Sequence, residues 1–349
     1  MKGRILWLLL TIVGTISVKA ISFDLDSIAS WGKFPRFCVN TYRWGDKFFN
    51  GYDTVYVDGT GYKWNTKVRT ETWTDRYDLH FENGTDMSMV SNPSTSIGLH
   101  LQYLALSVGY DKNISRYFNG GEEAKRRWVF GFNCMLFNAS LYFIQNNTGS
   151  HINSFKPYGK NGYNPDLVYK GIDNTSWGLD ISYYFSHKHY SHAAAFAFSR
   201  VQKRSAGSFF AGFSYGRVEY DFDLNGLPED MAEAIPNDIP NNHYILKTHN
   251  YILSGGYGYN WVFARHWVLG ATGQLMYGLS DGYYIDTTTK KLSFTALARS
   301  ELSVVWNNKH WFAGAIFNAR VGMARDHKRS ILSSVFNLEM SVGYRFNLW

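Results

Sequence analysis

The sequence predicts an all-β fold, namely an antiparallel transmembrane β-barrel of about ten strands. The C-terminal segment carries the clearest pattern, because apolar residues from Phe336 to Leu348 alternate without a break with polar or small ones. Such a strand has one apolar face and one polar face, and it exceeds the roughly nine to eleven tilted residues that cross a bilayer. After Ala20 no continuous apolar run reaches the length of a membrane helix, so any further membrane contact must come through strands.

The first twenty residues have the pattern of a secretory signal peptide. Lys2 and Arg4 precede an apolar run, and the small residues around Ala20 are suited to cleavage, so we expect the mature chain to begin near Ile21. An uncleaved anchor is the alternative, although the apolar run is short for a spanning helix. The predicted organisation is a signal peptide over 1–20, a periplasmic segment or plug over 21–65, and an outer-membrane barrel over 66–349.

Composition agrees with a barrel and argues against other classes. Aromatic residues make up 18% of the chain and the mean hydropathy is −0.28, as expected when half of each strand faces a polar lumen. The formal net charge of +7 includes Lys2, Arg4 and Lys19 of the predicted signal peptide. The remaining charge is too small and too scattered to indicate nucleic-acid binding. The two cysteines, Cys38 and Cys134, exclude a disulfide framework and leave at most one bridge.

Segments with a period of two predict the strands in order, and their even number suits a single-chain barrel. A further strand or a helix over Ala193–Ser199 makes twelve strands the alternative. The apolar positions switch phase around Gly216, which predicts a β-bulge there. The predicted strands are 66–82, 95–110, 127–145, 174–187, 206–224, 244–263, 266–281, 290–306, 310–325 and 331–348.

The connections predict which end of the barrel faces the periplasm, because periplasmic turns are short and outer loops are long. The tight turns Phe263–His266 and Asn307–His310 are therefore predicted to be periplasmic, and the stretches 146–174 and 224–244 external. The connections 110–127 and 187–206 fit less well, since both are long and fall on the periplasmic side. Six tryptophans are predicted to form an aromatic belt on the periplasmic rim: Trp128, Trp261, Trp267, Trp306, Trp311 and Trp349.

Charged residues on the polar faces of the later strands are predicted to lie in the lumen. A barrel of about ten strands is narrow, so we expect these side chains to pair with one another as a polar core. A lumen that conducts or binds a ligand is the alternative. The residues are Arg299, Glu301, Asn318, Arg320, Glu339 and Arg345.

The connection that begins at His187 is the one place where histidines and a serine crowd together. His189 and Ser191 resemble the His-x-Ser stretch of outer-membrane phospholipase A, which would make His189 a base and Ser191 a nucleophile. An outer-membrane lipid hydrolase that uses the His187–Ser191 region is therefore the alternative function. A basic turn that meets headgroups is the preferred interpretation, and no catalytic, cofactor-binding or metal-binding residue is predicted.

Outer-membrane lipids and the barrel-assembly machinery are the predicted partners. Cations in the loops Lys156–Lys170 and Arg325–Arg329 are placed to meet lipopolysaccharide phosphates. Tyr344, Phe346 and Leu348 supply the aromatic and apolar C-terminal pattern of a barrel-assembly signal, although Trp349 is one position out of phase with it.

Four segments carry a resemblance to a known family: Asp53–Val57, His187–Tyr190, Arg204–Phe209 and Asn260–Trp267. They resemble the domain of unknown function 4421 family of Bacteroidota. The resemblance extends from about residue 50 to the end of the chain, and it implies an outer-membrane β-barrel of a Gram-negative cell. It implies no activity, so the expected role is structural, binding or narrow transport.

Overall fold

The structure is a computed structural model that describes residues 29–30, 32–115, 125–146, 150–169, 172–235, 243–284, 291–325 and 329–347. The chain forms two compact units, residues 1–47 with 347–349, and residues 48–346. The helix α3 (Lys33–Asn50) begins in the first unit and ends in the second. No helix among the described residues has both the length and the apolar character needed to cross a membrane.

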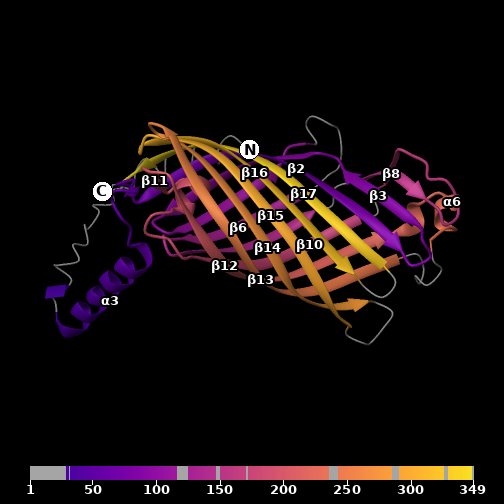
Figure 1. The fold of residues 1–349 in the computed structure, drawn as a ribbon, viewed down its shortest axis with the longest axis horizontal. Coiled ribbons are helices and arrows are strands. Elements are labelled where there is room, and N and C mark those ends of the chain that lie inside the picture. The colour runs from indigo at the N-terminus through magenta and orange to yellow at the C-terminus, as the bar shows by residue number, and fades with distance from the viewer. Residues whose placement is uncertain are drawn as a thin grey trace, which may run out of the picture. The chain divides into compact units, whose positions relative to one another are not determined.

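Twelve antiparallel strands form a closed barrel within residues 48–346, and the pairing of β17 with β2 completes the ring (Figure 1). This confirms the predicted barrel and gives it twelve strands. The barrel strands are β2 (Trp64–Phe81), β4 (Ser94–Tyr103), β5 (Leu106–Asn113), β6 (Lys125–Asn133), β7 (Phe137–Asn146), β10 (Ile172–Tyr184), β12 (Ala206–Asp223), β13 (His243–Ala264), β14 (Trp267–Tyr284), β15 (Lys291–Asn307), β16 (Trp311–Arg325) and β17 (Arg329–Phe346).

The two additional strands arise because two predicted strands are hairpins. The predicted strand 95–110 turns at Leu104, and the predicted strand 127–145 turns at Cys134. Neither turn contains glycine, proline or asparagine, and Leu104 adopts a positive φ of 53° that such residues usually supply. Ala193–Ser199, for which a further strand or a helix was predicted, contains most of the helix α5 (His192–Phe196) and adds no strand to the barrel.

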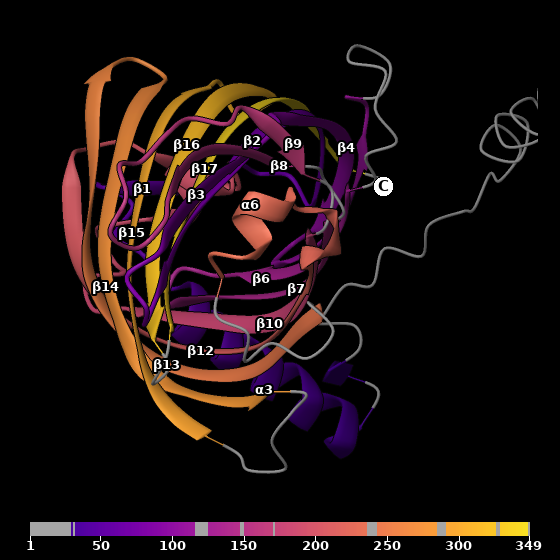
Figure 2. The same ribbon diagram turned by 90° about the vertical axis from the view of Figure 1, so that its right-hand side faces the viewer.

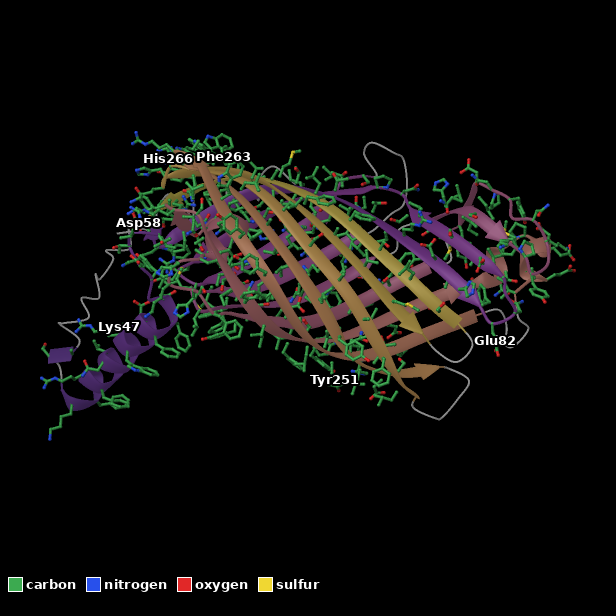
Figure 3. The ribbon with its side chains drawn as sticks, viewed as in Figure 1. Lys47, Asp58, Glu82, Tyr251, Phe263 and His266 are labelled. Atoms are coloured by element: carbon green, nitrogen blue, oxygen red, sulfur yellow. The ribbon has the colours of Figure 1, made fainter. Side chains whose placement is uncertain are left out.

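We call the end of the barrel with the turns 263–266 and 307–310 the tight-turn end, and the opposite end the long-loop end. With twelve strands, the long connection after β5 lies at the long-loop end. Of the two long connections predicted at the tight-turn end, the one between β10 and β12 therefore remains. Figure 3 shows Asp58, Phe263 and His266 at the tight-turn end and Glu82 at the other end.

The prediction that Trp128 lies on the periplasmic rim was wrong, because β6 begins at the long-loop end and Trp128 lies near that beginning. Trp349 lies outside the described residues.

The outer surface of the barrel is apolar and the lumen is polar. Along β17, Leu338, Met340 and Val342 are exposed, whereas the alternating Glu339 and Ser341 are buried. This matches the alternation in the sequence and gives the wall a lipid-facing side.

The predicted β-bulge at Gly216 is absent, because β12 and β13 pair in one continuous register from Ala206↔Asn260 to Asp223↔His243. The apolar residues change phase for another reason. Below Gly216 they face outward, whereas above it Arg217 and Glu219 face outward and Val218 faces inward. A strand that leaves the lipid needs a polar outer face, so its apolar residues move to the inner face.

A hydrophobic cap occupies the long-loop end. The inward residues Tyr77, Leu79 and Phe81 of β2 pack there against residues of three short strands and of the segment that contains the helical turns η1 and α6. These elements are β3 (Asp86–Ser91), β8 (Ser150–Lys156), β9 (Leu167–Tyr169), η1 (Leu224–Gly226) and α6 (Glu229–Ala232). Viewed along the barrel, α6 lies within the ring of strands (Figure 2).

Candidate functional site in the barrel lumen

Arg69 of β2 is the centre of a charged cluster inside the barrel. Its Nε donates to Asp111 Oδ1 at 2.8 Å, and its Nη1 donates to Glu339 Oε2 at 2.7 Å. Glu71 lies 3.5 Å from its Nη2. All four side chains are nearly inaccessible to solvent, so the pairing compensates charges that would otherwise be costly to bury.

Neighbouring side chains extend this cluster around the wall. Lys67 Nζ lies 3.0 Å from Glu339 Oε1, and Arg127 Nη1 of β6 lies 2.7 Å from Glu71 Oε1. Asn337 donates to Glu71, and Asn318 of β16 donates to Asn337 Oδ1 at 2.9 Å. The cluster therefore joins β2, the later strands and the short strands through their inner faces.

A second charged group lies on β14 and β15. Arg299 Nη2 is 2.8 Å from Glu301 Oε1, and Thr272 Oγ1 donates to Glu301 Oε2 at 3.2 Å. A polar cavity of about 240 Å³ separates the two groups, and Lys67, Arg69, Arg299, Glu301 and Glu339 are among the residues that line it. The predicted lumen residues Arg299, Glu301, Asn318 and Glu339 thus meet around one cavity.

The connection between β10 and β12 folds into the tight-turn end of the barrel. Together with residues 51–63 it forms what we call the end plug, residues 51–63 and 186–204. The plug contains β1 (Val57–Gly59), which pairs with β11 (Arg200–Gln202), and the helix α5. His192 and Phe196 of α5 line the lumen cavity, so the plug forms part of the cavity wall at this end.

Hydrogen bonds fasten the plug to the wall. Asn260 of β13 donates to the carbonyl of Ser191 at 2.8 Å and to Gln202 Oε1 at 3.1 Å. Asn307 Nδ2 donates to the carbonyl of Arg200 at 3.0 Å. Tight packing adds to these bonds, because a side chain at Gly270 would meet the Cβ of Ala195 at 2.6 Å.

Arg345 of β17 completes the attachment and is 1% exposed. It donates to Asn307 Oδ1 at 3.0 Å and to the carbonyl of Lys309 at 2.7 Å, and it also donates to the carbonyl of Phe198 in the plug. Its guanidinium lies 4.4 Å from the centre of the Phe312 ring. Arg345 was predicted as a lumen residue, and its role is to bind the plug.

An ion pair joins the first part of the plug to a tight turn. Lys309 Nζ lies 2.7 Å from Asp58 Oδ2. The hydrogen bond from Lys309 lowers the pKa of Asp58 below its ordinary value. Residues 51–63 of the predicted segment 21–65 therefore belong to the plug.

The structure gives Ser191 a structural role. Its side chain is fully buried, and its Oγ accepts a hydrogen bond from the amide of Ala194, which caps the N-terminus of α5. His189 is half-exposed, packs against the ring of Tyr56 and lies 3.5 Å from Asp53. Cys134 is a free, buried thiol, and among the described residues no three His, Cys, Asp or Glu side chains are grouped to hold a metal ion.

Sequence reasoning missed the contribution of the N-terminal strands to the lumen. Lys67, Arg69 and Glu71 occupy alternate positions of β2, and that spacing alone places them on one face. The alternation along β5 gave the same signal for Asp111. No local pattern, in contrast, indicates that β2 pairs with β17.

A family model described as "Domain of unknown function (DUF4421)" matches residues 51–346, which include the plug and every barrel strand. The chain belongs to the DUF4421 family. No curated protein matched this DUF4421 sequence.

Among the solved structures that match this chain are three proteins of the bacterial outer membrane or its autotransporters. The outer membrane protease OmpT from Escherichia coli is 10% identical with a TM-score of 0.35, and the match covers 81% of this chain and 96% of that one. The β domain of the Bordetella autotransporter BrkA is 9% identical with a TM-score of 0.35, covering 81% and 100%. The Pseudomonas putida toluene transporter TodX is 10% identical with a TM-score of 0.28, covering 82% and 91%. The barrel fold of this DUF4421 chain rests on its own strand pairing, which closes between β17 and β2.

Proposed function

We propose that this protein is a closed barrel of the bacterial outer membrane with a structural or binding role, and that it does not act as an open diffusion pore. The observation that carries the proposal is the end plug, which hydrogen-bonds to wall residues on several strands. An aqueous channel needs a continuous polar path, and in the described part of the chain the plug at one end and the hydrophobic cap at the other interrupt it.

The paired charges favour a fixed lumen. Arg69 bridges carboxylates from β5 and β17, so these side chains cross-link the inner wall. Moving them apart to let a solute pass would leave buried charges without partners, which is strongly unfavourable. The cavity of about 240 Å³ between the charged groups is lined by several charged and polar residues and suits a small polar ligand or ordered water.

Export and orientation form part of the same proposal. Residues 1–20 are proposed to direct secretion and to be removed near Ile21, which mass spectrometry of the mature protein would test. The tight turns and the plug are proposed to face the periplasm, as short turns do in barrels of this class. Insertion by the barrel-assembly machinery is proposed from the alternating C-terminal strand.

The test is ion conductance in planar bilayers with the full-length mature protein. The wild type is expected to give no stepwise conductance. A variant in which short glycine-serine turns replace both the plug segment 187–204 and the cap segments 150–169 and 224–235 is expected to conduct. Heat-dependent gel mobility shows whether each protein is folded, because a closed barrel resists detergent until it is heated. Stepwise conductance by the folded wild type would contradict the proposal.

A further inference from the structure

Two cations lie directly opposite each other on the outer face of the short strands. Lys112 of β5 pairs with Arg126 of β6 in the antiparallel register, and both side chains are exposed and point outward. Like charges at directly opposed positions repel each other and destabilise the strand pair. An anion placed between them would reverse this effect.

On the barrel strands, the other outward cations whose side chains are described have carboxylate partners. Arg76 Nε lies 3.0 Å from Asp78 Oδ2, and Lys247 Nζ lies 2.9 Å from Glu219 Oε1. Arg217 lies 3.7 Å from the same glutamate. Among the described residues no carboxylate is within ion-pair distance of Lys112 or Arg126. The described residues therefore supply no counter-ion to this pair.

Aromatic rings lie next to the two cations on the same face. Tyr110 of β5 and Trp128 of β6 occupy the next outward positions toward the tight-turn end. The centres of their rings are 4.4 Å apart. Tyrosine and tryptophan prefer the level of lipid headgroups in membrane proteins. Lys112 and Arg126 thus lie one outward position closer to the long-loop end than the two rings, beside the level that headgroups occupy.

An apolar groove continues from these rings along the lipid-facing wall. Its volume is about 480 Å³, within the roughly 300–1,000 Å³ range of ligand pockets. Val108 and Phe130, the next outward residues of β5 and β6, line it together with Leu141 of β7. The paired residues Ser107, Gly131 and Ser140 of these three strands also border the groove.

We propose that this face binds the lipid A part of lipopolysaccharide, with a phosphate between Lys112 and Arg126 and an acyl chain in the groove. A phosphate accepts charge-assisted hydrogen bonds from both cations at once, and the chain continues past Tyr110 and Trp128 into apolar surroundings. Lipid A is a phosphorylated and multiply acylated lipid, so it offers both groups in one molecule. The proposal rests on the proposed orientation, which puts the long-loop end of the barrel in the outer leaflet.

The test uses the full-length mature protein, freed of lipid in detergent and offered an equal mixture of lipid A and phosphatidylglycerol. Native mass spectrometry counts the lipids that each protein retains. The wild type is expected to retain lipid A. The double variant Lys112→Gln with Arg126→Gln is expected to retain about tenfold less lipid A or still less, because the loss of even one hydrogen bond to a charged group lowers affinity by that factor. Exchanging the two cations, Lys112→Arg with Arg126→Lys, is expected to preserve binding.

Matched variants separate the site from general effects on the barrel. Arg76→Gln removes an outward cation that already has a partner and is expected to leave lipid A binding unchanged. Leu141→Trp fills the groove and is expected to weaken binding, whereas Leu253→Trp, an exposed position on β13, is not. Gel mobility before and after heating checks that each variant is folded.

Three results would overturn the proposal: no lipid A retained by the wild type, equal retention by the double glutamine variant, or equal retention of phosphatidylglycerol through the same two cations. An orientation opposite to the proposed one would be detected separately, because cysteines introduced at Leu104 and Lys309 in the tight turns would then be labelled on intact cells. Conductance of the wild type would contradict the closed lumen and leave the lipid measurement intact.

Discussion

Arg69 on the first barrel strand lies 2.7 Å from Glu339 on the last, so a buried ion pair crosses the seam where the barrel closes. The backbone register pairs Arg69 with Ser341 and Glu339 with Glu71, which places the charged side chains on one inner face. The seam is therefore held by side chains as well as by the backbone ladder.

Glu339→Gln is expected to destabilise the folded barrel by about 3–5 kcal/mol, because it leaves Arg69 and Lys67 buried without this partner. Urea unfolding in detergent or lipid measures the change. Glu219→Gln is the control, since it removes an exposed pair with Lys247 and is expected to cost about 0–1 kcal/mol. Equal effects of the two substitutions would show that the seam pair has no special role.

Gly270→Leu is expected to displace the plug, because even a Cβ at this position meets Ala195 at 2.6 Å. The matched variant Gly273→Leu faces outward on the same strand, where a Cβ would have no neighbour within 4 Å. Limited proteolysis of the folded proteins measures the result, and cleavage within 186–204 is expected only for Gly270→Leu. Protection of both variants would mean that α5 does not pack on this glycine.

Ser191→Ala is expected to cost about 1 kcal/mol of stability through the lost helix cap, and Ser191→Thr much less. Because the hydroxyl is buried and caps α5, hydrolysis of phospholipid vesicles is expected to be the same for wild type and Ser191→Ala. A wild-type hydrolytic activity that disappears in Ser191→Ala would support the lipid hydrolase instead.

Cysteine labelling distinguishes twelve strands from ten. In a Cys38→Ser background, cysteines at Leu104 and Lys309 are expected to react with an impermeant maleimide only after the outer membrane is opened, because both lie in tight turns. A cysteine at Lys160 is expected to react on intact cells. In a ten-strand barrel position 104 would lie inside a membrane strand and would not react under either condition.

Local pattern predicted the strands from β10 onward to within a few residues, because each alternates over many positions and is followed by a recognisable turn or a long polar loop. The hairpin at Leu104 was missed because its turn has no turn-forming residue. A signal was present: the outward residues are odd-numbered up to Tyr103 and even-numbered from Leu106. The same kind of phase change near Gly216 marks a strand leaving the lipid, so a phase change alone has two physical causes.

The plug was harder to predict than the wall. Its attachment depends on residues distant in sequence, such as Asn260 with Ser191 and Arg345 with Phe198. The Ala193–Ser199 stretch gives a weak helical pattern but no indication that it enters a barrel. The hydrophobic cap similarly combines residues of β2 with residues after β12, and local periodicity cannot show that pairing.

A zero-length cross-link in native outer membranes tests most directly whether the end plug fills the barrel. A carbodiimide should join the Asp58 carboxylate of the plug to the Lys309 amine of the wall, because the two groups form an ion pair at 2.7 Å. We expect mass spectrometry to find this linked peptide pair in the wild type and to lose it in Asp58→Asn. Modification of Asp58 without any link to Lys309 would contradict the plugged barrel.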